Sequence, residues 1–254
     1  MLMHPYTKDL AHFYTQSANK RHHTRRRHWP EFDYIVTYIN QLNKEELTIV
    51  ELGCGDWRLY GYLIEHCPAK CFRYVWVDVS QWLIDLAIQQ YPDATWLCDE
   101  MMSYIETIPQ QSCDVIIGIA SIQHIPTREQ QSLIFHEIYR VLNYWWSLIM
   151  TNRCISKWFL RRYWIPLCKS FCYFLLTCGY LSWRDVMIPF TDWIVYHRFY
   201  HIYSHSRLDR LLKLAWFVVI QSCYISTQWA MTSKWQHSRN HFHIASKSIS
   251  QQSH

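Results

Sequence analysis

A short apolar run at residues 48–52 stops at two glycines, Gly53 and Gly55, which are separated by one residue. A helical pattern follows at 58–66. Glycine lets the backbone turn tightly between a strand and a helix, and it lets a ligand approach the main chain without meeting a Cβ atom. The strand before this Gly-x-Gly pair and the helix after it predict a turn that binds a nucleotide-like ligand.

Strands and helices alternate on both sides of this turn. The predicted strands are 48–52, 72–77, 94–98, 114–119, 148–151, 217–220 and 242–245. These features predict an α/β protein with a Rossmann-like, doubly wound, mostly parallel seven-stranded sheet and helices on both faces. A segment of aromatic and basic residues interrupts the alternation and predicts a helical, aromatic insertion after the fifth strand.

The chain divides into five predicted segments. They are a basic N-terminal arm at 1–30, a core at 31–152, an insertion or cap at 153–204, a segment that completes the sheet at 205–246 and a tail at 247–254. The most apolar segment, 164–181, contains Pro166 and Lys169 and is short for a bilayer span. It predicts a buried helix or substrate cap, and no association with a membrane is expected.

Acidic residues follow the second and third predicted strands. Asp78 lies 25 positions beyond Gly53, where a carboxylate can accept hydrogen bonds from ribose hydroxyls. Asp99 ends the third strand, where it can meet an adenine amino group. No Lys-Ser or Lys-Thr pair follows the glycines, which argues against a phosphate-binding P-loop.

The order of these motifs resembles that of class I S-adenosylmethionine (SAM)-dependent methyltransferases. The matching segments are ELGCGD at 51–56, VDVS at 77–80 and CDEM at 98–101, and the resemblance spans residues 47–152. Four further segments resemble the tRNA wobble-uridine carboxymethyl methyltransferases. They are TRRRHWP at 24–30, CDVIIGIASIQHIPTREQ at 113–130, HEIYRVL at 136–142 and HRFYHIYSHSRLDRLL at 197–212.

This resemblance implies a SAM cofactor and a set of site residues. The implied cofactor site consists of Glu51, Gly53, Cys54, Gly55, Trp57, Asp78, Val79, Asp99, Glu100, Ile119, Ala120 and Ser121. His124 follows the fourth strand and is the candidate for substrate-side chemistry, although a lone histidine is more often structural. The candidates for contact with RNA or another substrate are Arg25, Arg26, Arg27, Arg153, Tyr200 and His201.

The implied reaction is in-line methyl transfer to the carboxymethyl group of a tRNA wobble uridine. A carboxylate is already a competent nucleophile, so a site without an obvious catalytic base suits it. The resembled enzymes can require a small activating protein. Two alternatives stay open: a small-molecule methyltransferase that uses the 153–200 segment as a lid, and a non-catalytic binding module or partner subunit.

Charge and cysteine usage narrow the class of protein further. A net charge of +5 permits an anionic partner such as RNA but does not require one. None of the ten cysteines forms a C-x-x-C pair, and the N-terminus shows no signal-peptide pattern, so a cytoplasmic protein with reduced thiols is expected. Cys168, Cys172 and Cys178 lack a second spaced ligand pair, so no metal site is predicted. The oligomeric state stays open.

Tryptophan is abundant and glycine is scarce in this chain. There are 14 tryptophans and 5 glycines, whereas average usage would give about 18 glycines. Five tryptophans stand where the resembled superfamily commonly has glycine: Trp57, Trp76, Trp145, Trp146 and Trp216. Our hypothesis is that these residues are glycines in the living protein, encoded by a UGA codon that has been read as tryptophan.

Overall fold

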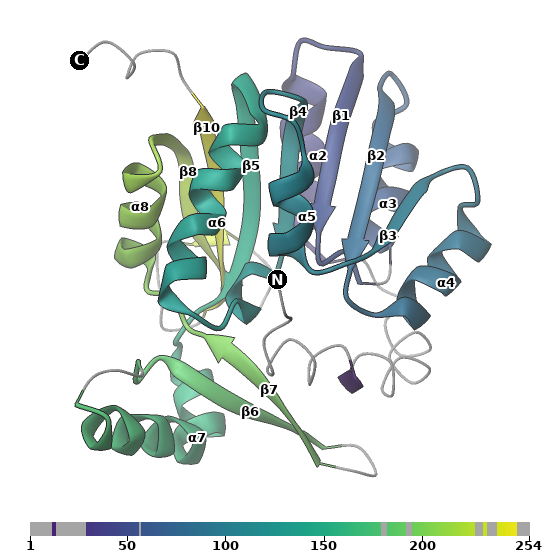
Figure 1. The fold of residues 1–254 in the computed structure, drawn as a ribbon. Helices are drawn as coiled ribbons and strands as arrows, with labels where there is room; N and C mark the ends of the chain where they lie inside the picture. The colour runs from purple at the N-terminus through teal and green to yellow at the C-terminus, as the bar shows by residue number, and fades with distance from the viewer. Residues whose placement is uncertain are drawn as a thin grey trace.

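The computed structural model describes residues 12–13, 29–55, 57–178, 182–191, 195–226, 231–232 and 238–247. Its main body is a twisted sheet with helices on both faces, and a smaller lobe lies beyond one end of the strands (Figure 1). Most of the predicted N-terminal arm and nearly all of the predicted tail lie outside the described residues. Lys247, predicted to begin the tail, is the last residue of the final strand.

The first part of the chain alternates strictly between strands and helices. The elements are α2 (Glu31–Gln41), β1 (Glu46–Leu52), α3 (Arg58–His66), β2 (Cys71–Asp78), α4 (Gln81–Gln90), β3 (Thr95–Cys98), α5 (Met101–Thr107), β4 (Cys113–Ile119), the 3-10 turn η1 (Ile122–His124), α6 (Arg128–Val141) and β5 (Leu142–Arg153). Thr127 caps α6 by accepting a hydrogen bond from the N–H of Gln130. The short helix α5 was not predicted, since seven residues carry little periodic signal.

The strand order in the large sheet is β3-β2-β1-β4-β5-β10-β8-β9. The strands β1 to β5 pair in parallel, whereas β10 (Ser238–Lys247) pairs antiparallel with both β5 and β8 (Phe217–Ser226). The predicted fold class is therefore confirmed, with eight strands in place of seven. The additional strand is β9 (Met231–Thr232), a two-residue edge strand that pairs with β8.

Apolar faces of the helices bury both sides of the sheet. In α6, Ile134, Ile138 and Val141 recur at helical spacing and pack into one core cluster with residues of α5 and α8 (His205–Leu214). Side chains of α2 and α3 fill a second cluster on the opposite face. Because helices cover both faces of the parallel strands, a ligand can approach at the carboxyl ends of the strands. The strand order reverses between β1 and β4, which makes this the switch point of the sheet.

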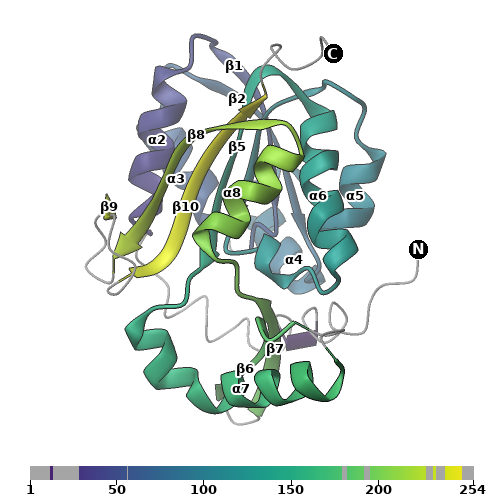
Figure 2. The same cartoon turned by 90° about the vertical axis from the view of Figure 1, so that its left-hand side faces the viewer.

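The insertion after β5 forms the smaller lobe. It contains α7 (Lys157–Leu176) and a separate two-stranded antiparallel sheet of β6 (Asp185–Thr191) and β7 (Val195–His201), as Figure 2 shows. Of the two alternatives for residues 164–181, the buried helix is wrong, since only Phe159 and Ser170 of α7 are buried, whereas the substrate cap stays a prediction. A single short hairpin covers one stripe of a helix and leaves the rest exposed. In the part of the chain that the structure describes, no helix has the length and apolarity that crossing a membrane requires.

Candidate cofactor and acceptor site

The turn after β1 has a left-handed backbone that favours glycine. Gly53 and Gly55 have φ angles of +73° and +60°. The N–H groups of Gly53 and Cys54 both donate to the carbonyl of Val77, at 2.7 and 3.1 Å, which holds the turn against β2. A Cβ atom on Gly53 would lie 2.5 Å from the Cβ of Ser121. The turn after β1 and the turn after β4 therefore meet closely enough to require glycine.

Asp78, at the end of β2, is bonded to this turn. One carboxylate oxygen accepts from the N–H of Gly55 and the other from the N–H of Ser80, each at 2.9 Å. These two bonds orient the carboxylate, and carboxylate oxygens are acceptors of the kind that ribose hydroxyls need. Asp78 is mostly buried, and its contacts fix the carboxylate at the edge of the sheet.

The end of β3 brings Asp99 next to Asp78. The N–H of Asp99 donates to the carbonyl of Asp78 at 3.1 Å, and the Asp99 carboxylate accepts from the N–H of Glu100 at 2.7 Å. Burial and the neighbouring charge of Asp99 raise the pKa of Glu100. Val79 contributes its carbonyl to a weak bond from the thiol of Cys98, at 3.8 Å.

The end of β4 contributes a buried polar atom. Ala120 has a φ angle of +53°, and its N–H donates to the carbonyl and hydroxyl oxygens of Thr151 at 2.9 and 3.1 Å. This turn places Ser121 against Gly53, and Ile119 precedes it in the buried strand. The hydroxyl of Ser121 is buried and has no hydrogen-bond partner among the described residues. A glycine cradle beside an unpaired hydroxyl suits a ligand with polar groups, so these residues fit SAM.

Two implied cofactor residues have further structural roles. Glu51 is buried and accepts a hydrogen bond from the hydroxyl of Tyr74 at 2.9 Å. Burial and the charge of Glu51 hold the pKa of Tyr74 well above its ordinary range. Trp57 precedes α3 in a left-handed conformation, with a φ angle of +50°, and is almost fully buried beside the cofactor turn.

His124 lies where the insertion closes over the main sheet. Its Nδ1 is 2.7 Å from the carbonyl of Phe199 in β7, so Nδ1 carries the proton and donates. Its ring makes an edge-on contact with Tyr200, at 4.5 Å between ring centroids. Gln123, the preceding residue, accepts from the N–H of Arg153 at 2.5 Å. The turn after β4 is therefore tied to both the end of β5 and β7.

Neighbouring residues of β7 point to opposite sides. Tyr200 contacts His124, whereas His201 lies 2.5 Å from the carboxylate of Asp185 in β6. Burial lowers the pKa of His201, and Asp185 opposes that shift. The structure therefore brings Tyr200 to His124 and places His201 in a contact that links the two strands of the hairpin.

Sequence reasoning missed two residues at this edge. Arg198 lies on the same side of β7 as Tyr200, with its guanidinium 5.3 Å from the centre of that ring and 5.0 Å from the ring of Phe13. The period of two in a strand would have indicated Arg198 once Tyr200 was chosen. Asn152 of β5 is fully buried, and neither polar atom of its side chain has a partner among the described residues. The predicted residues Arg25, Arg26, Arg27 and Asp56 lie outside the described part of the chain.

Comparison with known proteins agrees with this geometry. Residues 49–144 match a family model described as a methyltransferase domain. A SAM-dependent methyltransferase from Methanosarcina mazei shares the fold with a TM-score of 0.63 at 16% identity, over 84% of this chain and 97% of that chain. No curated protein matches the sequence.

Two further solved structures share the fold. The 1,6-didemethyltoxoflavin-N1-methyltransferase of Burkholderia thailandensis, which holds 1,6-didemethyltoxoflavin and S-adenosylhomocysteine, has a TM-score of 0.61 at 13% identity, over 98% of this chain and 92% of that chain. A Haloferax volcanii methyltransferase in complex with the Trm112 methyltransferase activator has a TM-score of 0.62 at 12% identity, over 94% and 97%. The fold and the cofactor turn define the class I SAM-dependent methyltransferases. Within this chain, residues 49–144 match the methyltransferase domain, and the fold is the one that these SAM-dependent methyltransferases share.

Proposed function

We propose that this enzyme methylates the carboxylate of a carboxymethyl group on a tRNA wobble uridine. The observation that carries the proposal is the guanidinium of Arg153, at the end of β5. Its Nη1 is buried and has no hydrogen-bond partner among the described residues. A guanidinium binds carboxylates through paired, charge-assisted hydrogen bonds, so an anionic acceptor at this edge satisfies it.

The residues around the acceptor position act by binding and orientation. When bound, SAM would supply an activated methyl group to a carboxylate oxygen, and S-adenosylhomocysteine would be the leaving group. Arg153 holds the carboxylate beside the ends of β4 and β5. Nδ1 of His124 donates to the carbonyl of Phe199, which holds the imidazole ring in one orientation beside β7. Tyr200 packs over that ring and limits the access of water.

The exposed surface of α7 suits a nucleic acid. The helix contains four basic residues and no acidic residue: Lys157, Arg161, Arg162 and Lys169. Its exposed aromatic side chains are Trp158, Trp164, Phe171 and Tyr173. Cationic side chains neutralise phosphates, and aromatic rings stack on unpaired bases such as those of an anticodon loop. This helix begins at Lys157, four residues after Arg153, so the basic segment follows the acceptor position closely along the chain.

A small activating protein is part of the proposal. The Haloferax volcanii neighbour was solved with such an activator. In this chain, β3 is an outer strand of the large sheet and pairs only with β2 among the described strands. Its outer edge offers backbone groups to which a partner strand can add.

The test uses tritium-labelled SAM with two preparations of one tRNA, with and without the wobble carboxymethyl group. We expect label only in the carboxymethyl tRNA, and we expect alkali to release it because the product is an ester. Arg153→Ala should lower kcat/KM by roughly 10- to 100-fold, the value of a charged hydrogen bond. The control is Arg73→Ala, since Arg73 is exposed near the opposite end of β2 and pairs with Glu46.

Alkali-stable label, or label in small acids but not in tRNA, would contradict the proposed acceptor. Equal activity of the two arginine variants would remove the role assigned to Arg153. Methyl transfer that requires a co-purified small protein would support the proposal of an activating partner.

A further inference from the structure

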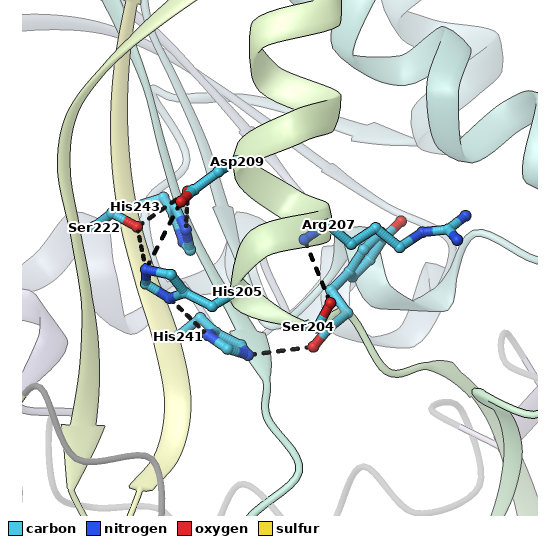
Figure 3. A network of polar contacts seen from close by, with 8 residues as sticks. Ser204, His205, Arg207, Asp209, Ser222, His241 and His243 are labelled. Atoms are coloured by element: carbon cyan, nitrogen blue, oxygen red, sulfur yellow. Dashed lines mark hydrogen bonds and ion pairs between the residues drawn. The ribbon is translucent and has the colours of Figure 1, made fainter.

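Three side chains of the kinds that bind metals converge where α8 packs on β8 and β10 (Figure 3). His205 and Asp209 lie one turn apart on α8, and His243 lies on β10. One donor atom from each lies within 4.8 Å of the other two. Nε2 of His243 is 3.1 Å from one oxygen of Asp209, and Nε2 of His205 is 3.9 Å from the other.

A chain of hydrogen bonds orients His205 toward this point. Nε2 of His241 is 3.2 Å from the carbonyl of Tyr203, which can only accept, so this nitrogen carries a proton. In a neutral His241 the other nitrogen, Nδ1, is then an acceptor, and it lies 3.3 Å from Nδ1 of His205. His205 therefore donates from Nδ1, and its Nε2 carries the lone pair, with the hydroxyl of Ser222 at 2.7 Å and an oxygen of Asp209 at 3.9 Å. Metal-binding histidines are commonly oriented by donating their second ring N–H in this way.

The hydroxyl group of Ser222 lies between two hydrogen-bond acceptors and can donate to only one of them. Its hydroxyl oxygen lies 2.7 Å from Nε2 of His205 and 3.1 Å from an oxygen of Asp209. With His205 protonated on Nδ1, both of these atoms are acceptors, and the hydroxyl has one proton to donate. A cation between them would satisfy the lone pair that the hydroxyl leaves unpaired.

We propose that His205, Asp209 and His243 bind one divalent transition-metal ion of the zinc type. Two imidazoles and one carboxylate form a nitrogen–oxygen ligand set that such ions prefer, and water completes the coordination. The side chains of His205 and Asp209 are 26% and 29% exposed, which gives the ion a path from solvent. The ion would link α8, the first element after the insertion, to β10. The sequence analysis considered only cysteines as metal ligands. It had no local spacing to indicate this cluster, since Asp209 and His243 lie 34 residues apart.

The test is a titration of the full-length, tag-free protein with Co²⁺ after treatment with a chelator. Co²⁺ gives visible absorption bands in a tetrahedral site, and Zn²⁺ should displace it. We expect one equivalent to bind to the wild type and to the control His66→Gln, which alters an exposed histidine on α3. Because His243 is fully buried, the test variants are the partly exposed Asp209→Asn and His205→Gln. Each should weaken binding by at least about tenfold, since loss of even an outer partner costs that much.

Absence of saturable Co²⁺ binding in the wild type would overturn the proposal. So would equal binding by Asp209→Asn, His205→Gln and the wild type. A strong near-ultraviolet sulfur-to-cobalt band would assign the ion to cysteines instead, and that result would also overturn it.

A separate observation concerns tryptophan in left-handed backbone. Six non-glycine residues have positive φ angles among the described residues, and three are tryptophans: Trp57 at +50°, Trp145 at +73° and Trp216 at +65°. Tryptophan accounts for 14 of the 254 residues of the chain but for three of these six positions, so it is strongly over-represented there. A Cβ atom makes this conformation costly, and glycine avoids the cost.

The other two suspected positions differ. Trp76 and Trp146 do not have positive φ angles. Trp76 is fully buried and stacks on Trp96 at 3.7 Å between ring centroids, although its indole N–H has no partner among the described residues. We infer that glycine occupies positions 57, 145 and 216 of the protein as its own organism makes it, through a UGA codon read there as glycine.

The test is peptide mass spectrometry of the protein purified from its own organism. We expect glycine at positions 57, 145 and 216, and tryptophan at Trp29, which serves as the internal control. Tryptophan at the three positions, or UGG codons in the gene, would overturn the inference. This outcome is independent of the metal titration, since none of the three residues belongs to the metal cluster.

Discussion

The carboxylate of Asp78 accepts a hydrogen bond from the backbone N–H of Gly55, at 2.9 Å, across 23 residues of sequence. This bond joins the turn after β1 to the end of β2. It holds the Gly53–Gly55 turn and the Asp78 carboxylate, which we expect to meet the ribose, in one arrangement without a bound ligand. Preorganisation of this kind lowers the cost of ordering the site on binding.

Asp78→Asn should therefore weaken SAM binding. An asparagine offers one oxygen and one NH₂ group where two N–H groups of the backbone now point at oxygens, so one donor would face another donor. We expect affinity to fall by roughly 10- to 100-fold, the value of a charged hydrogen bond. Calorimetric titration measures it, and Asp85→Asn is the control because Asp85 is exposed on α4 and contacts Gln81. Equal affinities of the two variants would refute the assignment of Asp78.

Gly53→Ala and Gly61→Ala should behave differently. At Gly53 the φ angle is +73° and the new Cβ atom would meet the Cβ of Ser121 at 2.5 Å, so neither the backbone nor its neighbour can accommodate it. We expect a loss of at least roughly 1–2 kcal/mol in unfolding free energy, together with loss of SAM binding. At Gly61 the Cβ atom would meet only the hydroxyl of Tyr91, the end of a flexible side chain. Urea unfolding should show a change below about 1 kcal/mol there, because alanine also favours the helix.

Trp145→Gly should stabilise the protein that carries tryptophan at this position. Trp145 is 64% exposed with a φ angle of +73°, so little packing is lost and left-handed strain is relieved. We expect a net gain on the order of 0.5–1 kcal/mol after the added backbone entropy of glycine. The matched control is Trp164→Gly, because Trp164 is 60% exposed inside α7 and a glycine there should cost roughly 0.5–1 kcal/mol. A loss of stability in both variants would contradict the glycine inference at position 145.

Stability should fall on acidification because of buried histidines. The pKa of His241 is about 3 in the folded protein, against an ordinary value of 6.5, and burial also lowers the pKa values of His205 and His201. Below 6.5 the unfolded chain binds protons that the folded chain does not, so the unfolding free energy decreases from that pH toward 3. The slope is up to about 1.4 kcal/mol per pH unit for each proton.

His241→Gln isolates one of these protons. Glutamine can still donate to the carbonyl of Tyr203 but does not titrate. With chelator present, urea unfolding at about pH 7 and about pH 5 should give a shallower pH dependence in the variant than in the wild type, by up to one proton. Identical slopes would mean that His241 is not buried as a neutral ring.

Most of the core of the fold could be predicted from the sequence. The strand at 48–52, the glycine turn and the helix at 58–66 each carry a local signal, and the structure has β1 ending at Leu52 and α3 at Arg58–His66. The hairpin β6–β7 and the exposure of α7 could not be predicted, because they depend on which segments pack together. The same limit applies to His201, whose neighbour Asp185 lies in a strand that the sequence did not indicate.

The sequence by itself determined the alternation of strands and helices, the cofactor turn and the acidic residues that end β2 and β3. Backbone preference and hydrophobic period are local properties, so they can be read without a partner segment. Only the tertiary structure decided that β7 closes over His124, that Ser121 leaves no room for a side chain at Gly53, and that two histidines and an aspartate converge beside α8. These contacts join residues far apart in the chain, and packing alone brings them together.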